Sequence, residues 1–191
     1  MPLLILDEQP YAVFTRRRAD LRRHAGEISF PGGRRDPEDA DLRATALREA
    51  EEEIGLAPTA VEVLGELPPT STFVTGYLIH PFVGSIAPGQ RWRASPGEVD
   101  AILELPLHDL RESRTRTRME RRGISFETDA YILGEHLIWG ATARILDDLL
   151  ARLDELLQRA GRAPSAAGAS EMGASEMGAS AQPLPSAQDR A

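Results

Sequence analysis

Cysteine is absent from the 191 residues of this sequence. Its absence excludes disulfide bonds, thiol catalysis and cysteine-ligated metals, and it is compatible with a reducing cytosol, so we expect a cytoplasmic protein. A positive net charge is also lacking, because 30 acidic and 22 basic residues give a formal net charge of -8. A nucleic-acid-binding protein needs a basic face, so this balance argues against that class of partner.

Long apolar runs are missing as well. The start, MPLLILDEQP, has an apolar run of only four residues before Asp7. It therefore lacks the length and the basic flank of a secretory signal peptide. No uninterrupted apolar stretch approaches the ~20 residues of a membrane helix, so we expect no membrane association. The chain is long enough for one compact domain with its own core.

Apolar segments of two kinds predict a mixture of strands and helices. Short strands are expected at residues 3–6, 11–15, 28–30, 60–67 and 77–86, with a turn at Gln9 and Pro10 and a hairpin over residues 111–133 that turns near Arg122 and Gly123. The basic residues 16–27 are interpreted as irregular, and residues 95–110 as a short strand followed by a proline-broken turn.

Two helices are expected, of unlike character. Asp41 is a suitable N-cap for a helix over residues 42–54, and Gly55 is a suitable left-handed end. Residues 138–160 form the second, with Ile145, Leu149, Leu153 and Leu156 on one stripe. Sheet and helices together indicate an α+β or α/β sandwich.

The composition changes after Gly161. The segment GASEMGASEMGAS is a tandem repeat of small and polar residues. Such a segment cannot bury enough apolar surface to offset its ordering entropy. We therefore expect a folded domain over residues 1–161 and a disordered, low-complexity tail over residues 162–191.

The stretch REAEEEIGL places several carboxylates on the first helix. At about 100° per residue, Glu49 and Glu53 lie on one edge of its apolar face, whereas Glu52 is four residues after Arg48, at ion-pair spacing. Glu51 points away and is expected to be solvated. Two carboxylates at the edge of a buried face repel each other, and a hard divalent cation would reverse that cost. The alternative is a solvated acidic helix face.

The surroundings of this helix favour the metal-binding interpretation. The corner Gly32-Gly33 precedes it, and glycine lets backbone groups approach a ligand closely. Arginines surround the segment in sequence: Arg16, Arg17, Arg18, Arg22, Arg23, Arg34 and Arg35. Cations for phosphates beside carboxylates for a metal are the usual parts of a phosphoryl-transfer site.

The residues GG-RRDPED followed by REAEEEIGL resemble the Nudix box, whose back half is matched in full by residues 48–56. The front half departs from the pattern. Five residues separate Gly33 from Asp39, where the box has glutamate. Eight residues instead of seven then separate Asp39 from Arg48. The resemblance implies an α-β-α sandwich with a mixed β-sheet between helices, and an enzyme that uses Mg²⁺ or Mn²⁺.

A second resemblance lies upstream. The segment VFTRRRADLRRHAGEISFPGG is similar to the signature of the Nudix subfamily that hydrolyses coenzyme A, although Arg18 and Val13-Phe14 depart from it. Segments up to about residue 150 also look like that subfamily. The resemblance implies hydrolysis of coenzyme A, or a derivative, to 3',5'-ADP and 4'-phosphopantetheine. Arg17 and Arg22 would then bind substrate phosphate or order the loop.

The mechanism expected from these residues uses the glutamate helix. Glu49 and Glu53 bind the metal, with a carbonyl oxygen of the Gly32-Gly33 corner as a further ligand. Glu52, oriented by Arg48, is either another ligand or the general base. Glu98 is a second candidate for the base or for a distal ligand; a surface acid at a turn is its plain alternative.

Other interpretations stay open. The substrate is alternatively ADP-ribose, a dinucleotide or a nucleoside triphosphate, or the chain is a nucleotide-binding Nudix module without catalysis, although such a module would be expected to lack ligand carboxylates. His24 and His80 are weaker site candidates. The alternating Arg114, Arg116 and Arg118 either cover the site and bind a 3'-phosphate, or form a charged strand edge. The protein is expected to be a monomer or a homodimer.

Overall fold

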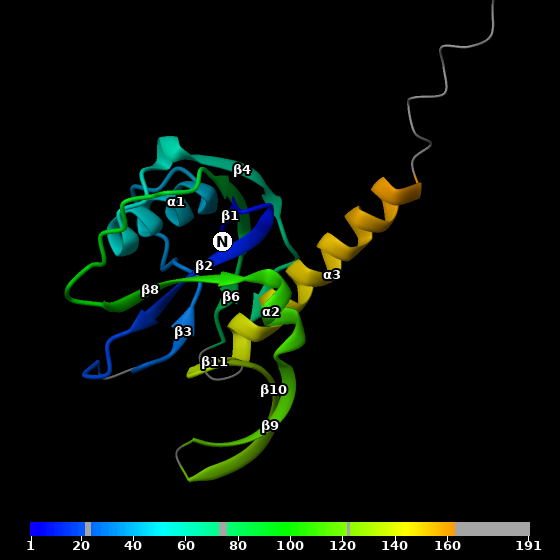
Figure 1. Cartoon of the computed structure of the whole chain (residues 1–191). Coiled ribbons are helices and arrows are strands. Elements are labelled where there is room, and N and C mark those ends of the chain that lie inside the picture. The colour runs from blue at the N-terminus through cyan, green and yellow to red at the C-terminus, as the bar shows by residue number, and fades with distance from the viewer. Residues whose placement is uncertain (22–23, 73–75, 122, 163–191) are drawn as a thin grey trace, which may run out of the picture.

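The computed structural model describes residues 1–21, 24–72, 76–121 and 123–162. A mixed β-sheet lies at its centre (Figure 1). Its strands are β1 (Pro2–Leu6), β2 (Gln9–Arg17), β3 (Ile28–Ser29), β4 (Val61–Glu66), β7 (Phe82–Ile86) and β8 (Val99–Pro106). Strands β1 and β7 are parallel, whereas β2 is antiparallel to β1, β3 and β8, and β4 is antiparallel to β7.

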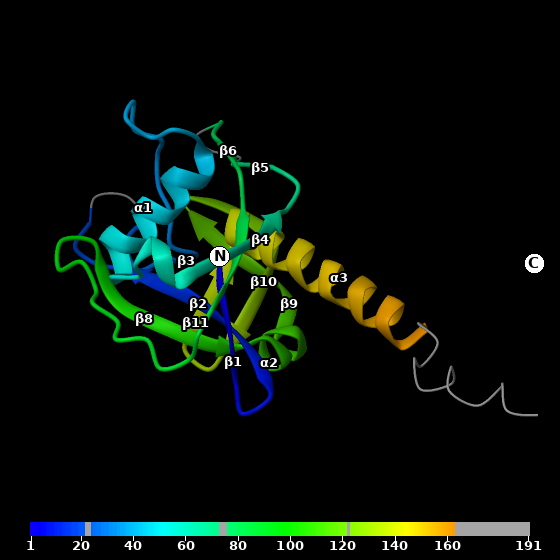
Figure 2. The same ribbon diagram turned by 90° about the horizontal axis from the view of Figure 1, so that it is seen from above.

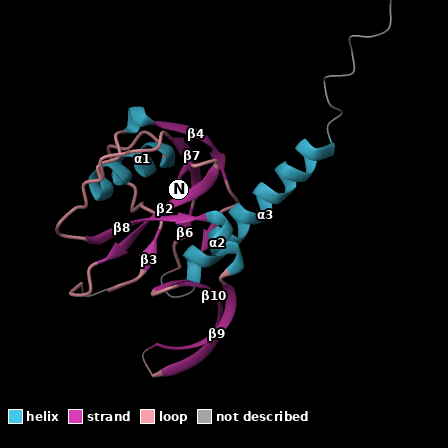
Figure 3. Cartoon of the chain, in the orientation of Figure 1, coloured by secondary structure: helices cyan, strands magenta, loops and turns pink. Residues whose placement is uncertain are grey.

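A second, antiparallel sheet has the order β11-β10-β9. Its strands are β9 (Arg114–Arg121), β10 (Ile124–Leu133) and β11 (His136–Trp139), and a short pair is formed by β5 (Thr70–Ser71) and β6 (Leu78–Ile79). The helices are α1 (Leu42–Ile54), α2 (Leu107–Glu112) and α3 (Gly140–Arg162), with a 3₁₀ turn η1 at Pro58–Ala60. Figure 3 shows how the helices flank the strands.

Strand β2 separates two apolar cores because successive side chains of a strand point to opposite faces. Val13 packs with Ala50 and Ile54 of α1. Phe14, from the other face, packs in the cluster that holds Leu146 of α3. Helix α1 and helix α3 therefore cover opposite faces of the sheet, which confirms the expected sandwich. Viewed from above, the far end of α3 extends away from the sheets (Figure 2).

Several expected elements are confirmed. Helix α1 begins after Asp41, whose side chain accepts a hydrogen bond from the Ala44 amide at 2.7 Å, and ends at Gly55 with φ of 73°. That left-handed angle is incompatible with a further helical turn, so the helix ends there, and glycine adopts the angle more readily than other residues. The hairpin predicted near residues 111–133 is formed by β9 and β10.

Other expectations were wrong. The first turn lies at Asp7 and Glu8, both with positive φ, while Pro10 is already part of β2. The expected proline-broken turn is helix α2, which starts directly after Pro106 and buries its leucines. The expected irregular segment at residues 16–27 starts inside β2, because Arg16 and Arg17 pair with β8. The last helix begins at Gly140, since β11 takes the preceding residues.

The predicted domain boundary falls at the end of α3, which runs to Arg162. The expected disordered tail lies outside the described residues from 163 onward. Within the described ranges, the helices are all too short or too polar to cross a membrane.

Candidate active site

The Gly32-Gly33 corner lies against the metal-binding edge predicted for α1. The Gly32 amide donates a hydrogen bond to Glu53 Oε2 at 3.1 Å. A β-carbon built on Gly33 would lie 2.3 Å from the carboxyl carbon of Glu49, far inside any real contact. The corner therefore needs glycine at position 33 for the Glu49 carboxylate to lie where it does.

Arg48 is the hub of the hydrogen bonds around this corner. Its Nε and Nη2 donate to the two oxygens of Asp39, each at 3.0 Å. The same guanidinium donates to Glu52 at 3.0 Å, to Glu49 at 3.1 Å and to the Arg34 carbonyl oxygen at 3.0 Å. The predicted ion pair between Arg48 and Glu52 is thus present. A planar guanidinium with five donors can join a loop and a helix in this way.

Asp39 is the residue that inspection of the sequence undervalued. Its buried carboxylate also accepts hydrogen bonds from the Thr45 hydroxyl and the Asp36 amide, both at 2.9 Å. The hydrogen bond from Arg48, and then that from the Asp36 amide, keep the pKa of Asp39 well below its ordinary value. The sequence does contain a signal for this contact, because Asp39 is an acid nine residues before Arg48. The shifted spacing of the Nudix box hides that signal.

Glu98 reaches the site through a loop that caps α1. The amides of Arg93 and Ser95 donate to the carbonyl oxygens of Ile54 and Glu53, at 3.0 and 2.8 Å. These carbonyls have no partner within the helix, so the loop satisfies them. The Glu98 and Val99 amides then donate to the carbonyl oxygen of Ser95, and this turn directs the chain toward the site. This capping role of Ser95 gave no sequence signal.

Arg17 lies between the carboxylates of two different elements. Its Nη1 is 3.8 Å from Glu53 Oε1 and 3.5 Å from Glu98 Oε2. Its Nε is buried and has no hydrogen-bond partner in the described part of the chain. An unpaired buried donor is costly, so a shift of this side chain toward an anionic oxygen would be favourable.

Burial changes the titration of the glutamates. Desolvation raises the pKa of Glu53 to about 7, against the opposing effects of the Gly32 amide and of Arg17. Desolvation also raises the pKa of Glu49, with the Arg48 charge opposing it. Glu98 repels both carboxylates, which places the three acids within electrostatic reach of one another. A bound cation would relieve this repulsion.

Arg22, a predicted phosphate ligand, lies outside the described residues. The other candidates that the structure describes have their contacts outside the edge formed by Glu49 and Glu53. Glu51 is exposed, as expected, whereas His24 and His80 pair with Glu27 and Glu66 at 2.6 and 2.7 Å. The hairpin arginines have partners close to their own sheet: Arg114 pairs with Asp147, Arg116 with Glu127 and Arg118 with Ser125.

The donor set suits a hard divalent cation that keeps part of its hydration. Glu49 and Glu53 supply oxygens at a partly desolvated corner, the type of ligand that Mg²⁺ accepts. Within the described ranges, no group of three or more acidic or histidine side chains is positioned to hold a metal ion without other ligands. Backbone carbonyls, water and substrate phosphate would have to complete the coordination.

Known proteins with similar sequences point to one family. The family model described as NUDIX domain matches residues 2–125. Relatives named "Uncharacterized Nudix hydrolase NudL", from Salmonella paratyphi B and Salmonella newport, are 43% identical over 147 residues, which cover 76% of this chain and 76% of theirs. The chain therefore belongs to the Nudix family and is a Nudix hydrolase.

Solved structures agree on the fold. The NUDIX domain of Shewanella oneidensis NrtR, complexed with ADP ribose, gives a TM-score of 0.51 at 16% identity, over 80% of this chain and 83% of that chain. The Nudix hydrolase RenU of M. smegmatis gives 0.54 at 12% identity, over 83% of each chain.

Substitution of Gly33 by alanine should displace the Glu49 carboxylate without unfolding the domain. The atoms in the way are the end of a flexible side chain, so we expect the free energy of unfolding to change by less than about 1 kcal/mol. The metal concentration needed for half-maximal turnover should rise by about 10–100-fold. Gly65→Ala is the matched control, because a β-carbon there meets nothing within 4 Å. Equal metal dependence of the two variants would contradict the proposed contact.

Burial of Glu53 should make the metal-free protein less stable as the pH rises. Because its pKa is about 7 in the fold and 4.5 as the ordinary value, the folded state binds the extra proton between these values. The contribution of Glu53 to the free energy of unfolding is therefore fully present below pH 4.5. It decreases between pH 4.5 and pH 7, by about 3 kcal/mol in total. Chemical denaturation across this range should show a shallower decrease for Glu53→Gln. Parallel profiles for wild type and variant would show that Glu53 is not desolvated.

Proposed function

We propose that this enzyme hydrolyses the pyrophosphate bond of coenzyme A, or of a coenzyme A derivative, to 3',5'-ADP and 4'-phosphopantetheine, with Mg²⁺ or Mn²⁺. The observation that supports it most is the place of Arg17. This arginine belongs to the upstream segment that resembles the coenzyme A signature, and its guanidinium faces Glu53 and Glu98. The segment that resembles the coenzyme A signature and the helix that carries Glu49 and Glu53 therefore lie next to each other.

In this proposal Glu49 and Glu53 hold the metal, together with a carbonyl oxygen of the Gly32-Gly33 corner. A metal held there would polarise the pyrophosphate and favour ionisation of the attacking water. Arg17 exchanges its long contacts to the carboxylates for contacts to substrate phosphate. Arg22, outside the described residues, remains a predicted second phosphate ligand.

Glu98 is the general base that the geometry favours over Glu52. The Glu98 carboxylate lies 3.5 Å from Arg17, which also contacts Glu53, whereas Glu52 is bonded to Arg48. The two glutamate side chains are similarly exposed, at 54% and 60%, so the contact with Arg17 alone supports this choice. In the proposed step, a water oxygen attacks one phosphorus, the bond from that phosphorus to the bridging oxygen breaks, and Glu98 accepts the water proton. Arg48 acts as a positioning residue through its hydrogen bond to Glu49. Glu52 is then assigned as a further ligand of the metal.

The catalytic unit is proposed to be residues 1–161, with the tail dispensable. Its activity is proposed to take place in the cytoplasm, on a small molecule and without nucleic acid or a membrane. Monomer and homodimer are both compatible with this chemistry.

Product analysis tests the substrate. Purified enzyme is incubated with coenzyme A, acyl-coenzyme A, ADP-ribose and a dinucleotide, with Mg²⁺, with Mn²⁺ and with a chelator. We expect 3',5'-ADP and 4'-phosphopantetheine, or its acyl form, and no products in chelator. Faster cleavage of ADP-ribose than of any coenzyme A compound would replace the proposed substrate and leave the proposed metal site intact.

Glu53→Gln should stay folded and lose metal-dependent turnover, because the amide removes one of the two proposed carboxylate ligands. Near-normal turnover of this variant in the same assay would remove Glu53 from the mechanism.

A comparison of Glu98→Gln with Glu52→Gln tests the base. We expect Glu98→Gln to lower kcat by about 10²–10⁴-fold, with the KM for substrate nearly unchanged, because a general base acts in the transition state. Glu52→Gln loses the exposed ion pair to Arg48 and should have a smaller effect. The reverse order of the two kcat values would assign the base to Glu52.

A further inference from the structure

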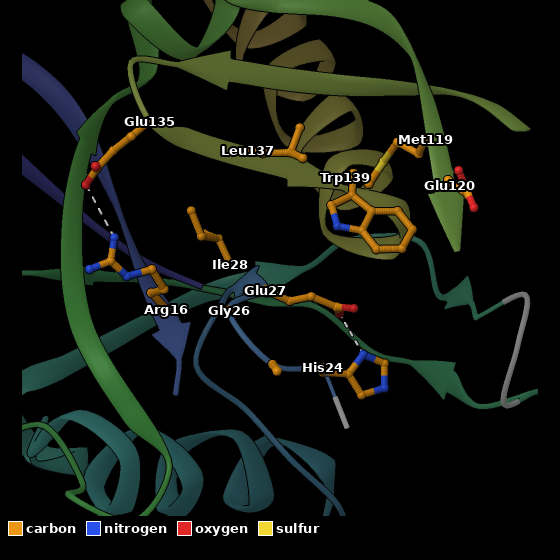
Figure 4. Close-up of a pocket in the computed structure, with 11 residues that line it drawn as sticks. Arg16, His24, Gly26, Glu27, Ile28, Met119, Glu120, Glu135, Leu137 and Trp139 are labelled. Atoms are coloured by element: carbon orange, nitrogen blue, oxygen red, sulfur yellow. Dashed lines mark hydrogen bonds and ion pairs between the residues drawn. The ribbon is translucent and has the colours of Figure 1, made fainter. Parts of the chain in front are cut away.

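A cavity of about 420 Å³ is lined in part by Ile28. Ile28 belongs to the apolar cluster of Phe14, on the face of β2 opposite to α1. It opens between residues 24–28 and the three-stranded sheet (Figure 4). One wall is apolar and consists of Ile28, Met119, Leu137 and Trp139. The nucleophile-activating residues proposed above do not line this cavity.

The apolar wall is built around Trp139. This residue ends β11 and packs on Phe126 of β10, with ring centroids 6.2 Å apart. Figure 4 shows its indole beside Met119. Partial burial of Trp139, Met119 and Leu137 leaves apolar surface that a ligand can cover.

Among the residues that the structure describes, the charges that line the cavity do not favour a phosphate. Arg16 is bonded to Asp100 at 3.0 Å and to Glu135 at 3.4 Å, and His24 is bonded to Glu27 at 2.6 Å. Glu120 adds a further acid to the lining. Carboxylates repel a phosphate but accept hydrogen bonds from amide N–H groups. An uncharged chain with amide groups and an apolar end fits this lining.

The cavity is within reach of the Gly32-Gly33 corner. Ile28 lines it, and Gly32, which contacts Glu53, is four residues further along the chain. Four extended residues span at most ~14 Å. The Arg17 amide donates to the Glu27 carbonyl oxygen at 3.0 Å, so the segment that carries the cavity residues is tied to the strand that carries Arg17.

We propose that this cavity, between residues 24–28 and β9–β11, binds the uncharged pantetheine arm of the substrate while the pyrophosphate lies at the Gly32-Gly33 corner. The proposal rests on the function proposed above. The arm is long and flexible enough to pass along β3 from the corner. Its amides meet the carboxylates, and its thiol end, or a short acyl group on it, meets Trp139 and Met119.

Tryptophan fluorescence tests this directly. The chain has two tryptophans. Trp92 lies elsewhere, bonded to Glu104, so in a Trp92→Phe variant the emission reports on Trp139 alone. We expect pantetheine, without any metal, to change this emission with saturation, and 3',5'-ADP to leave it unchanged. N-acetyltryptophanamide provides the control for collisional quenching by the thiol. A response to 3',5'-ADP instead of pantetheine, or to neither compound, overturns the proposal.

A kinetic comparison separates the failure of this proposal from that of the proposed function. Met119→Glu adds a charge to the partly exposed apolar wall and should raise the KM for coenzyme A roughly tenfold, with kcat little changed. The KM for ADP-ribose, which lacks the arm, should not change. If wild type cleaves coenzyme A but Met119→Glu has the wild-type KM, only the cavity assignment fails. If wild type does not cleave coenzyme A, the function fails, and the fluorescence titration still decides whether pantetheine binds.

Discussion

The double hydrogen bond between Arg48 and Asp39 is the interaction on which the rest of the site depends. It fastens helix α1 to the loop that precedes it, and the same guanidinium holds Glu49, Glu52 and the carbonyl oxygen of Arg34. Five donors on one planar group reach acceptors in both segments at once. The Gly32-Gly33 corner is thereby kept against the helix edge, where glycine leaves room for a carboxylate.

Desolvation of Glu53 is the main cost of this arrangement, and repulsion by Glu49 and Glu98 adds to it. Burial raises the pKa of Glu53, and the Gly32 amide and Arg17 compensate only in part. A cation at the corner and a phosphate on Arg17 would each remove part of the cost. The corner therefore brings buried carboxylates and a guanidinium together before any ligand is present, and such prior organisation is what electrostatic stabilisation of a transition state requires.

Two neighbouring arginines on β2 reach two different regions of the surface. Arg17 faces the glutamates, whereas Arg16 pairs with Asp100 and Glu135 at the cavity. The alternation of a strand sends adjacent side chains to opposite faces, and the register of β2 against β8 shifts between these two residues. One short basic segment can in this way contribute to two distinct regions.

The sequence by itself determined what depends on neighbours within a few residues. Helix α1, its Asp41 and Gly55 ends, the Arg48–Glu52 pair and the β9–β10 hairpin could all be predicted, since caps, turns and i,i+4 pairs are local. Only the tertiary structure decided the partner of Asp39, the approach of Glu98 through the Ser95 loop, the strand character of residues 136–139 and the helix at residues 107–112. These features depend on contacts with distant segments, and a single sequence does not encode such contacts in its local pattern because burial against another element overrides propensity.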